Sequence, residues 1–139
     1  MNRRQYIASL LALAAFSATL QAAPGEPFAA RDAATAWIQK IDTANYSESW
    51  ESAASVFKGA VSVQEWEKAA KSVRTPLGSV RKRTEKSATS TRSLPGAPEG
   101  QYVVFQYDTG FENKAATVET VTVAQDRDGS WRVAGYFIK

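Results

Sequence analysis

The sequence contains no cysteine and no histidine among its 139 residues. Without cysteine the chain forms no disulfide, so its stability must come from its core. Without either residue, metal sites built on thiolate or imidazole are excluded, and so is Ser-His-Asp or Cys-His catalysis. The glycines form no phosphate-binding loop, because no G-x-x-x-x-G-K-S/T pattern occurs. The sequence therefore predicts neither a metal nor a cofactor.

The chain also lacks an apolar run long enough to span a bilayer. Residues 7–20 are uncharged and rich in Leu and Ala, but a transmembrane helix needs about 20 residues. Arg3 and Arg4 precede this run, and Ala22 ends a stretch that resembles a cleavage site. We therefore predict a signal peptide over residues 1–22, a linker over 23–29 and one domain over 30–139. An uncleaved anchor is the alternative.

The export route follows from the same segment. The arginine pair with Tyr6 and Ile7 loosely resembles a twin-arginine signal, but paired arginines are frequent in general secretory signals, which we favour. Either route predicts a periplasmic or secreted protein. Such a protein contacts the membrane only through its signal peptide during export.

Residues 30–76 show the apolar spacing of three amphipathic helices. Their expected buried positions are Ala30, Ala34, Trp37, Ile41, Tyr46, Trp50, Ala53, Phe57, Val63, Trp66, Ala70 and Val73. Asn45 is placed to cap the second helix, which Gly59 ends, and Ser62 with Glu65 forms the capping box of the third. Thr75-Pro76 is expected to end the third helix.

The second half of the chain favours strands. Residues 78–93 are rich in threonine and charge, which is typical of an edge strand, and three further strands are expected within 101–139. The Asp126-Arg127-Asp128-Gly129 turn indicates a three-residue hairpin loop that pairs Val123 with Val133 and Val121 with Gly135. We therefore predict an α+β fold, with three N-terminal helices packed on a curved antiparallel sheet of about four strands.

This register predicts which residues face the helices. The expected inner pocket residues are Phe105, Tyr107, Glu119 and Phe137, beside Trp131 and Val133. A carboxylate in apolar surroundings can act as an acid or base, with a tyrosine donating to an oxyanion, so Glu119 and Tyr107 are weak catalytic candidates. The alternative is that Glu119 pairs with Lys114 or another base.

The opposite face of the sheet is expected to be too apolar for a fully solvated surface. Its residues are Tyr102, Val104, Val118, Ala134, Tyr136 and Ile138. We predict that this face is an interface, most simply of a homodimer. The alternative is that a loop covers it.

Basic residues are concentrated in residues 68–92, where Glu85 is the only acid. A solvated edge is the first interpretation, and the second is an anionic envelope component bound by Arg81, Lys82, Arg83 and Lys86. Nucleic acid is not expected, because the segment lacks interleaved aromatic residues for base stacking.

The whole pattern resembles the exported bacterial family called domain of unknown function 4019. The matching segments are Ala36-Trp37-Ile38, Ser49-Trp50-Glu51, Leu94-Pro95-Gly96-Ala97-Pro98, Glu119-Thr120-Val121 and Asp128-Gly129-Ser130-Trp131-Arg132-Val133-Ala134-Gly135-Tyr136. The order of helices and strands is similar to the NTF2-like, cystatin-related fold. The resemblance implies no activity and assigns no functional residues.

The expected function is a non-enzymatic binding or interaction module that self-associates through its sheet. One alternative is a small-molecule carrier or an isomerase-like or hydrolase-like enzyme that uses Glu119 and Tyr107. Another alternative is a protein that binds an anionic envelope surface through its basic edge strand.

Overall fold

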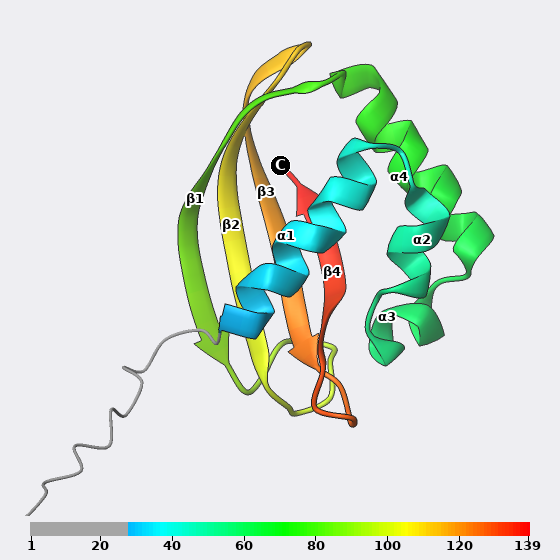
Figure 1. The fold of residues 1–139 in the computed structure, drawn as a ribbon, viewed down its shortest axis with the longest axis vertical. Coiled ribbons are helices and arrows are strands. Elements are labelled where there is room, and N and C mark those ends of the chain that lie inside the picture. The colour runs from blue at the N-terminus through cyan, green and yellow to red at the C-terminus, as the bar shows by residue number, and fades with distance from the viewer. Residues whose placement is uncertain (1–27) are drawn as a thin grey trace, which may run out of the picture.

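The computed structural model describes residues 28–139. The predicted signal peptide and residues 23–27 of the linker lie outside the described residues. Four helices come first and four strands follow (Figure 1): α1 (Phe28–Asp42), α2 (Tyr46–Glu51), α3 (Ser55–Ala60), α4 (Val63–Leu77), β1 (Val80–Thr91), β2 (Tyr102–Phe111), β3 (Lys114–Gln125) and β4 (Trp131–Ile138). No helix of the described part is both long and apolar enough to cross a membrane.

The strands form one antiparallel sheet in the order β1-β2-β3-β4. Helix α1 lies against β3 and β4, α2 packs between α1 and α4, and the sheet curves beside them (Figure 1). The predicted α+β class and the antiparallel four-stranded sheet are therefore confirmed, and the helices form a layer on one side of the sheet.

The core lies between α1 and the sheet. Trp37 is at its centre, with its ring 5.8 Å from that of Trp66 and 5.4 Å from that of Tyr136. The indole nitrogen of Trp37 donates to the carbonyl of Ser49 at 2.8 Å, and that of Trp66 donates to the hydroxyl of Ser49 at 2.8 Å. Both tryptophans are therefore buried with satisfied N–H groups, which is a structural role.

The predicted count of three helices is wrong, because the second helix is broken. α2 ends at Glu51, and α3 begins at Ser55 after Ala54 has taken an extended conformation. The N–H of Ala54 donates to the carbonyl of Val133 in β4 at 2.7 Å. A tertiary hydrogen bond to the edge of the sheet thus replaces helix continuation at a position without Gly or Pro.

The predicted N-cap Ser62 of the last helix is confirmed, although Glu65 accepts from the hydroxyl of Ser62 at 3.1 Å and not from its N–H. Ser62 accepts a hydrogen bond from the N–H of Glu65 at 3.2 Å. The end and the buried face of this helix differ from the prediction. α4 continues through Pro76, because a proline in the final turn removes only one helical hydrogen bond. Val73 is 48% exposed, whereas Arg74 is only 6% exposed. The face predicted to be apolar therefore carries a buried cation near its end.

The turn before β4 has the predicted geometry. The N–H of Asp126 donates to Ser130 at 2.8 Å, Gly129 has a φ of 83°, and Val123 pairs with Val133. Beyond this pair the predicted register is wrong. Thr122 pairs with Gly135, so Ala134 is an additional residue and forms a β-bulge.

The bulge reverses the faces of the rest of β4. Val121 pairs with Tyr136 and Glu119 pairs with Ile138, so Tyr136 and Ile138 lie on the inner face rather than at the predicted interface. Phe137 lies on the outer face and is 61% exposed, so it does not line the predicted inner pocket.

The outer face is covered at one end. Tyr102 and Ala124 are buried there with Ala54, and Leu94, Ala97 and Ala134 pack against them. The hydroxyl of Tyr102 donates to the carbonyl of Pro98. The loop that joins β1 to β2 therefore covers the sheet around Tyr102 and Ala134, two residues of the predicted interface.

Candidate functional site

The clearest chemical feature is a buried carboxylate on the inner face of β3. Glu119 is 0% exposed. Its Oε1 accepts from Nε of Arg83 at 2.7 Å and from Oγ1 of Thr109 at 2.6 Å. Its Oε2 accepts from Nη2 of Arg83 at 3.3 Å and from the hydroxyl of Tyr136. Both oxygens are therefore fully engaged by protein donors.

Arg83 belongs to the predicted basic patch, but its side chain turns inward. Besides Glu119, it binds Asp42 through Nη1 at 2.8 Å and Nη2 at 3.0 Å. Arg81, Lys82 and Lys86 are exposed on β1. The four residues therefore form no continuous patch, because Arg83 pairs with the buried Thr109 of the inner face, whereas β-bulges at Arg81 and Lys86 interrupt the alternation along β1.

A second arginine completes the cluster. Nη2 of Arg74 lies 2.9 Å from Oδ1 of Asp42, and its guanidinium lies 4.9 Å from the ring centre of Phe111. The Nε of Arg74 is buried and has no hydrogen-bond partner among residues 28–139. Burial raises the pKa of Asp42, but hydrogen bonds and charges from Arg83 and Arg74 outweigh that effect and lower it overall.

The two weak catalytic candidates are cross-strand neighbours, because Tyr107 pairs with Glu119. Burial raises the pKa of Tyr107 to about 12, and the negative charge of Glu85 adds to this. The hydroxyl that reaches Glu119, however, is that of Tyr136. Burial, then the charge of Glu119 and its hydrogen bond, raise the pKa of Tyr136 well above its ordinary value.

Of the predicted inner pocket, Phe105, Tyr107 and Glu119 are buried together, with the rings of Phe105 and Tyr107 stacked 6.4 Å apart. The sequence prediction did not include Arg74, Thr109 or Tyr136 in this region. Thr109 could have been found, because it follows Phe105 and Tyr107 in strict alternation.

The cluster joins four elements by balanced charges. Asp42 ends α1, Arg74 lies in the last turns of α4, Arg83 comes from β1 and Glu119 from β3. Two carboxylates face two guanidiniums, so no net charge is left to attract an ion. Within residues 28–139 no group of acidic side chains is placed to hold a metal ion. The arrangement is therefore suited to joining helices to sheet.

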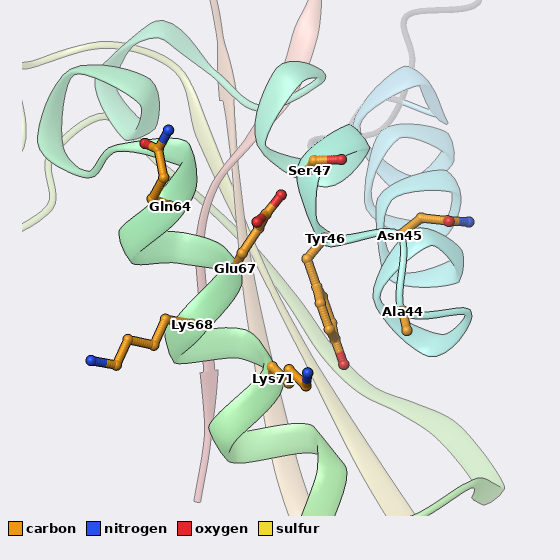
Figure 2. A pocket seen from close by; sticks show the side chains of 8 residues that line it. All are labelled: Ala44, Asn45, Tyr46, Ser47, Gln64, Glu67, Lys68 and Lys71. Atoms are coloured by element: carbon orange, nitrogen blue, oxygen red, sulfur yellow. The ribbon is translucent and has the colours of Figure 1, made fainter.

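A separate groove lies in the helical layer, between the turn that joins α1 to α2 and the exposed side of α4 (Figure 2). Its volume is about 670 Å³. The residues that line it are Ala44, Asn45, Tyr46, Ser47, Gln64, Glu67, Lys68 and Lys71. The sequence prediction treated Tyr46 as a core residue and did not anticipate this groove.

A layer of helices on one four-stranded antiparallel sheet defines a small α+β protein. Residues 33–136 match the family described as "Protein of unknown function (DUF4019)", and the chain belongs to this family. The family resemblance stated from the sequence is thus confirmed. None of the curated proteins matches the chain.

Proposed function

We propose that this protein is an exported, non-enzymatic binding module that self-associates through the outer face of its sheet. The observation that carries the proposal is the composition of that face. Uncharged outward residues adjoin one another on β2, β3 and β4: Val104, Gln106, Val118, Thr120, Thr122, Gly135 and Phe137. The exposed carboxylate of Asp108, paired with Val118, lies at their margin. The centre of a protein interface is depleted of charge in the same way.

Phe137 is the main apolar group of this face. It is 61% exposed on β4, and its cross-strand partner on β3 is Thr120. Val104 and Val118, which were predicted as interface residues, are half-buried on the neighbouring strands. Full burial of a phenylalanine side chain contributes about 1.5–3 kcal/mol. A two-fold dimer would bury this side chain twice, because each copy presents the same surface.

The inner face supports the non-enzymatic part of the proposal. Four protein donors occupy the oxygens of Glu119. A substrate proton would therefore have to displace an existing partner before it reached this carboxylate.

The wider assignment has two further parts. We assign the fold to the NTF2-like, cystatin-related group, on the basis of N-terminal helices packed on one face of a curved antiparallel sheet.

We assign residues 1–22 as a cleaved signal peptide, which leads to the periplasm or the exterior. Mass spectrometry of the exported protein tests the second part: a first residue at Ala23 supports it, and an intact N-terminus contradicts it.

Sedimentation velocity at tens of micromolar tests self-association. The proposal predicts a dimer that Phe137→Glu converts to a monomer, because a charge would then lie at the centre of the interface. Val73→Glu is the matched control, since Val73 is an exposed apolar residue of α4 and should leave the dimer intact. A wild-type protein that remains monomeric, or a dimer that persists in Phe137→Glu, would contradict the proposal.

A further inference from the structure

The groove in the helical layer begins with a well-defined turn. At the end of α1 the N–H of Ala44 donates to Ile41 at 3.1 Å and that of Asn45 donates to Lys40 at 2.8 Å, which is the Schellman pattern. Ala44 holds the left-handed position with a φ of 59°. The turn starts α2 immediately afterwards, and it places the ring of Tyr46 across from α4 (Figure 2).

The facing wall belongs to α4. Gln64, Glu67 and Lys71 follow one another at intervals of three and four residues on a common side of the helix, and Lys68 lies next to Glu67. Figure 2 shows Lys71 beside the ring of Tyr46 and Glu67 directed toward Ser47, whereas Lys68 extends outward from the rim. The groove therefore combines an aromatic ring, a cation and a carboxylate at neighbouring positions.

These charged groups are available to a ligand. Glu67 and Lys71 are separated by one helical turn, yet among residues 28–139 the ion pairs include neither of them, nor Lys68. The hydroxyl of Tyr46 likewise has no hydrogen-bond partner in that part of the chain. In contrast, the cations of the inner cluster are occupied: Arg74 and Arg83 both bind Asp42.

The chemistry of the lining selects a class of ligand. Amide, hydroxyl, carboxylate and ammonium groups line the groove together with a somewhat larger apolar surface, so the groove suits a molecule that carries both hydroxyl groups and apolar faces. Its volume of about 670 Å³ lies within the range of small-molecule sites. The half-buried ring of Tyr46 offers an apolar face with a polar tip. Two lysines and one glutamate leave a net positive charge.

We propose that this groove binds a short acidic oligosaccharide. A carboxylate of the sugar would bind Lys71, its hydroxyls would bind Glu67, Gln64 and Ser47, and one sugar ring would pack on Tyr46. Lys68 would add attraction from the rim. The site belongs to the helical layer and not to the outer face of the sheet, so it does not depend on the proposed self-association.

Calorimetric titration of the exported protein tests the proposal, with a trimer of galacturonic acid as the acidic probe and maltotriose as the neutral one. We expect saturable binding of the acidic trimer and at least about tenfold weaker binding of maltotriose, because a hydrogen bond to a charged group contributes strongly. Lys71→Gln should weaken binding of the acidic trimer about tenfold for the same reason. Lys68→Gln should have a smaller effect.

Two control variants sharpen the result. Lys82→Gln removes an exposed lysine of β1 and should leave binding unchanged, which separates this groove from a basic edge strand. Tyr46→Phe should retain most of the affinity, whereas Tyr46→Leu should lose several-fold because the aromatic face is gone. Circular dichroism checks that Tyr46→Leu folds. If this variant does not fold, Lys71→Gln still tests the proposal, because Lys71 is exposed and its replacement should not disturb the fold.

Three results would overturn the proposal: no saturable binding of the acidic trimer, equal affinity for maltotriose, or the same loss in Lys82→Gln as in Lys71→Gln. Salt gives one further criterion. Because the net charge of the groove is small, affinity should fall only moderately with added salt, and a collapse of binding would indicate non-specific attraction of a polyanion instead.

Discussion

Arg83 and Glu119 form an ion pair that joins the edge strand to the interior of the sheet. The atoms lie 2.7 Å apart, the carboxylate side chain is fully buried, and the guanidinium side chain retains 17% exposure. Arg83 also binds Asp42 at the end of α1. One cation thus connects β1, β3 and α1. Its guanidinium is occupied by two carboxylates, so it is not available to bind a further anion.

The first prediction concerns the removal of this cation. Arg83→Met should destabilise the protein by about 3 kcal/mol, because it leaves a buried carboxylate without its ion-pair partner. The double variant Arg83→Met/Glu119→Gln should lose clearly less than the sum of the two single variants, since neither charge is then left alone. Urea unfolding measures both effects. Strictly additive losses would show that the two side chains are not coupled.

The second prediction tests the bulge in β4. Tyr136→Ala should cost about 3 kcal/mol or more, because the ring packs on Trp37 in the core. Phe137→Ala should change stability by less than about 1 kcal/mol, since its side chain is mostly exposed. Unfolding is measured at a concentration low enough to keep the chain monomeric. A larger loss of stability in Phe137→Ala than in Tyr136→Ala would contradict the bulge and support a regular register.

The third prediction uses the strained turn after α1. Ala44→Gly should stabilise the protein by about 0.5–1 kcal/mol, because only glycine adopts the left-handed conformation at little cost. Ala69→Gly, at an exposed position within α4, should instead destabilise it by about 1 kcal/mol. Thermal unfolding of both variants gives the comparison. A loss of stability in Ala44→Gly would show that the left-handed conformation of Ala44 is not strained.

The fourth prediction concerns alkaline pH. The pKa of Tyr107 is raised from 10.0 to about 12, and that of Tyr136 is raised further. The fold therefore favours the protonated phenols, so their contribution to stability is present below pH 10 and is lost as the pH rises through the folded pKa values. Absorbance of tyrosinate should show two late-titrating groups in the folded protein.

Tyr136→Phe is the control for this titration. It should remove one late-titrating group and reduce the decline of the free energy of unfolding above pH 10. Loss of an ordinary tyrosinate transition near pH 10 in this variant would show that Tyr136 is not held protonated by its burial and by the neighbouring Glu119.

The sequence predicted those elements whose signals are local. The N-cap of Ser62, which accepts from the N–H of Glu65, and the turn at residues 126–129 both appear as expected, because a few neighbouring residues determine them. The break between α2 and α3 depends on a hydrogen bond from Ala54 to Val133, which is distant in the sequence. No periodicity could have revealed it.

The faces of β4 were not predictable for a related reason. Apolar residues occupy both sides of this strand, so a register shifted by one residue costs little in the hydrophobic pattern. The choice is made by tertiary contacts, in which Tyr136 reaches both Trp37 and Glu119. Similarly, the burial of Arg74 requires Asp42, which lies on another helix. The candidate site is therefore largely a product of long-range pairing.

The hydrogen bond from Ala54 to Val133 has a consequence for assembly. It occupies a carbonyl on the free edge of β4, and the bulge at Ala134 interrupts the same edge. The opposite edge, along β1, is longer, but its pairing shifts register between Val80 and Lys82 and between Glu85 and Ser87, so its longest regular stretch is residues 87–91. Growth of a fibril by strand addition requires two receptive edges on every subunit. A molecule with one blocked edge can pair with a second copy through its other edge, but the resulting dimer cannot add further molecules by strand pairing.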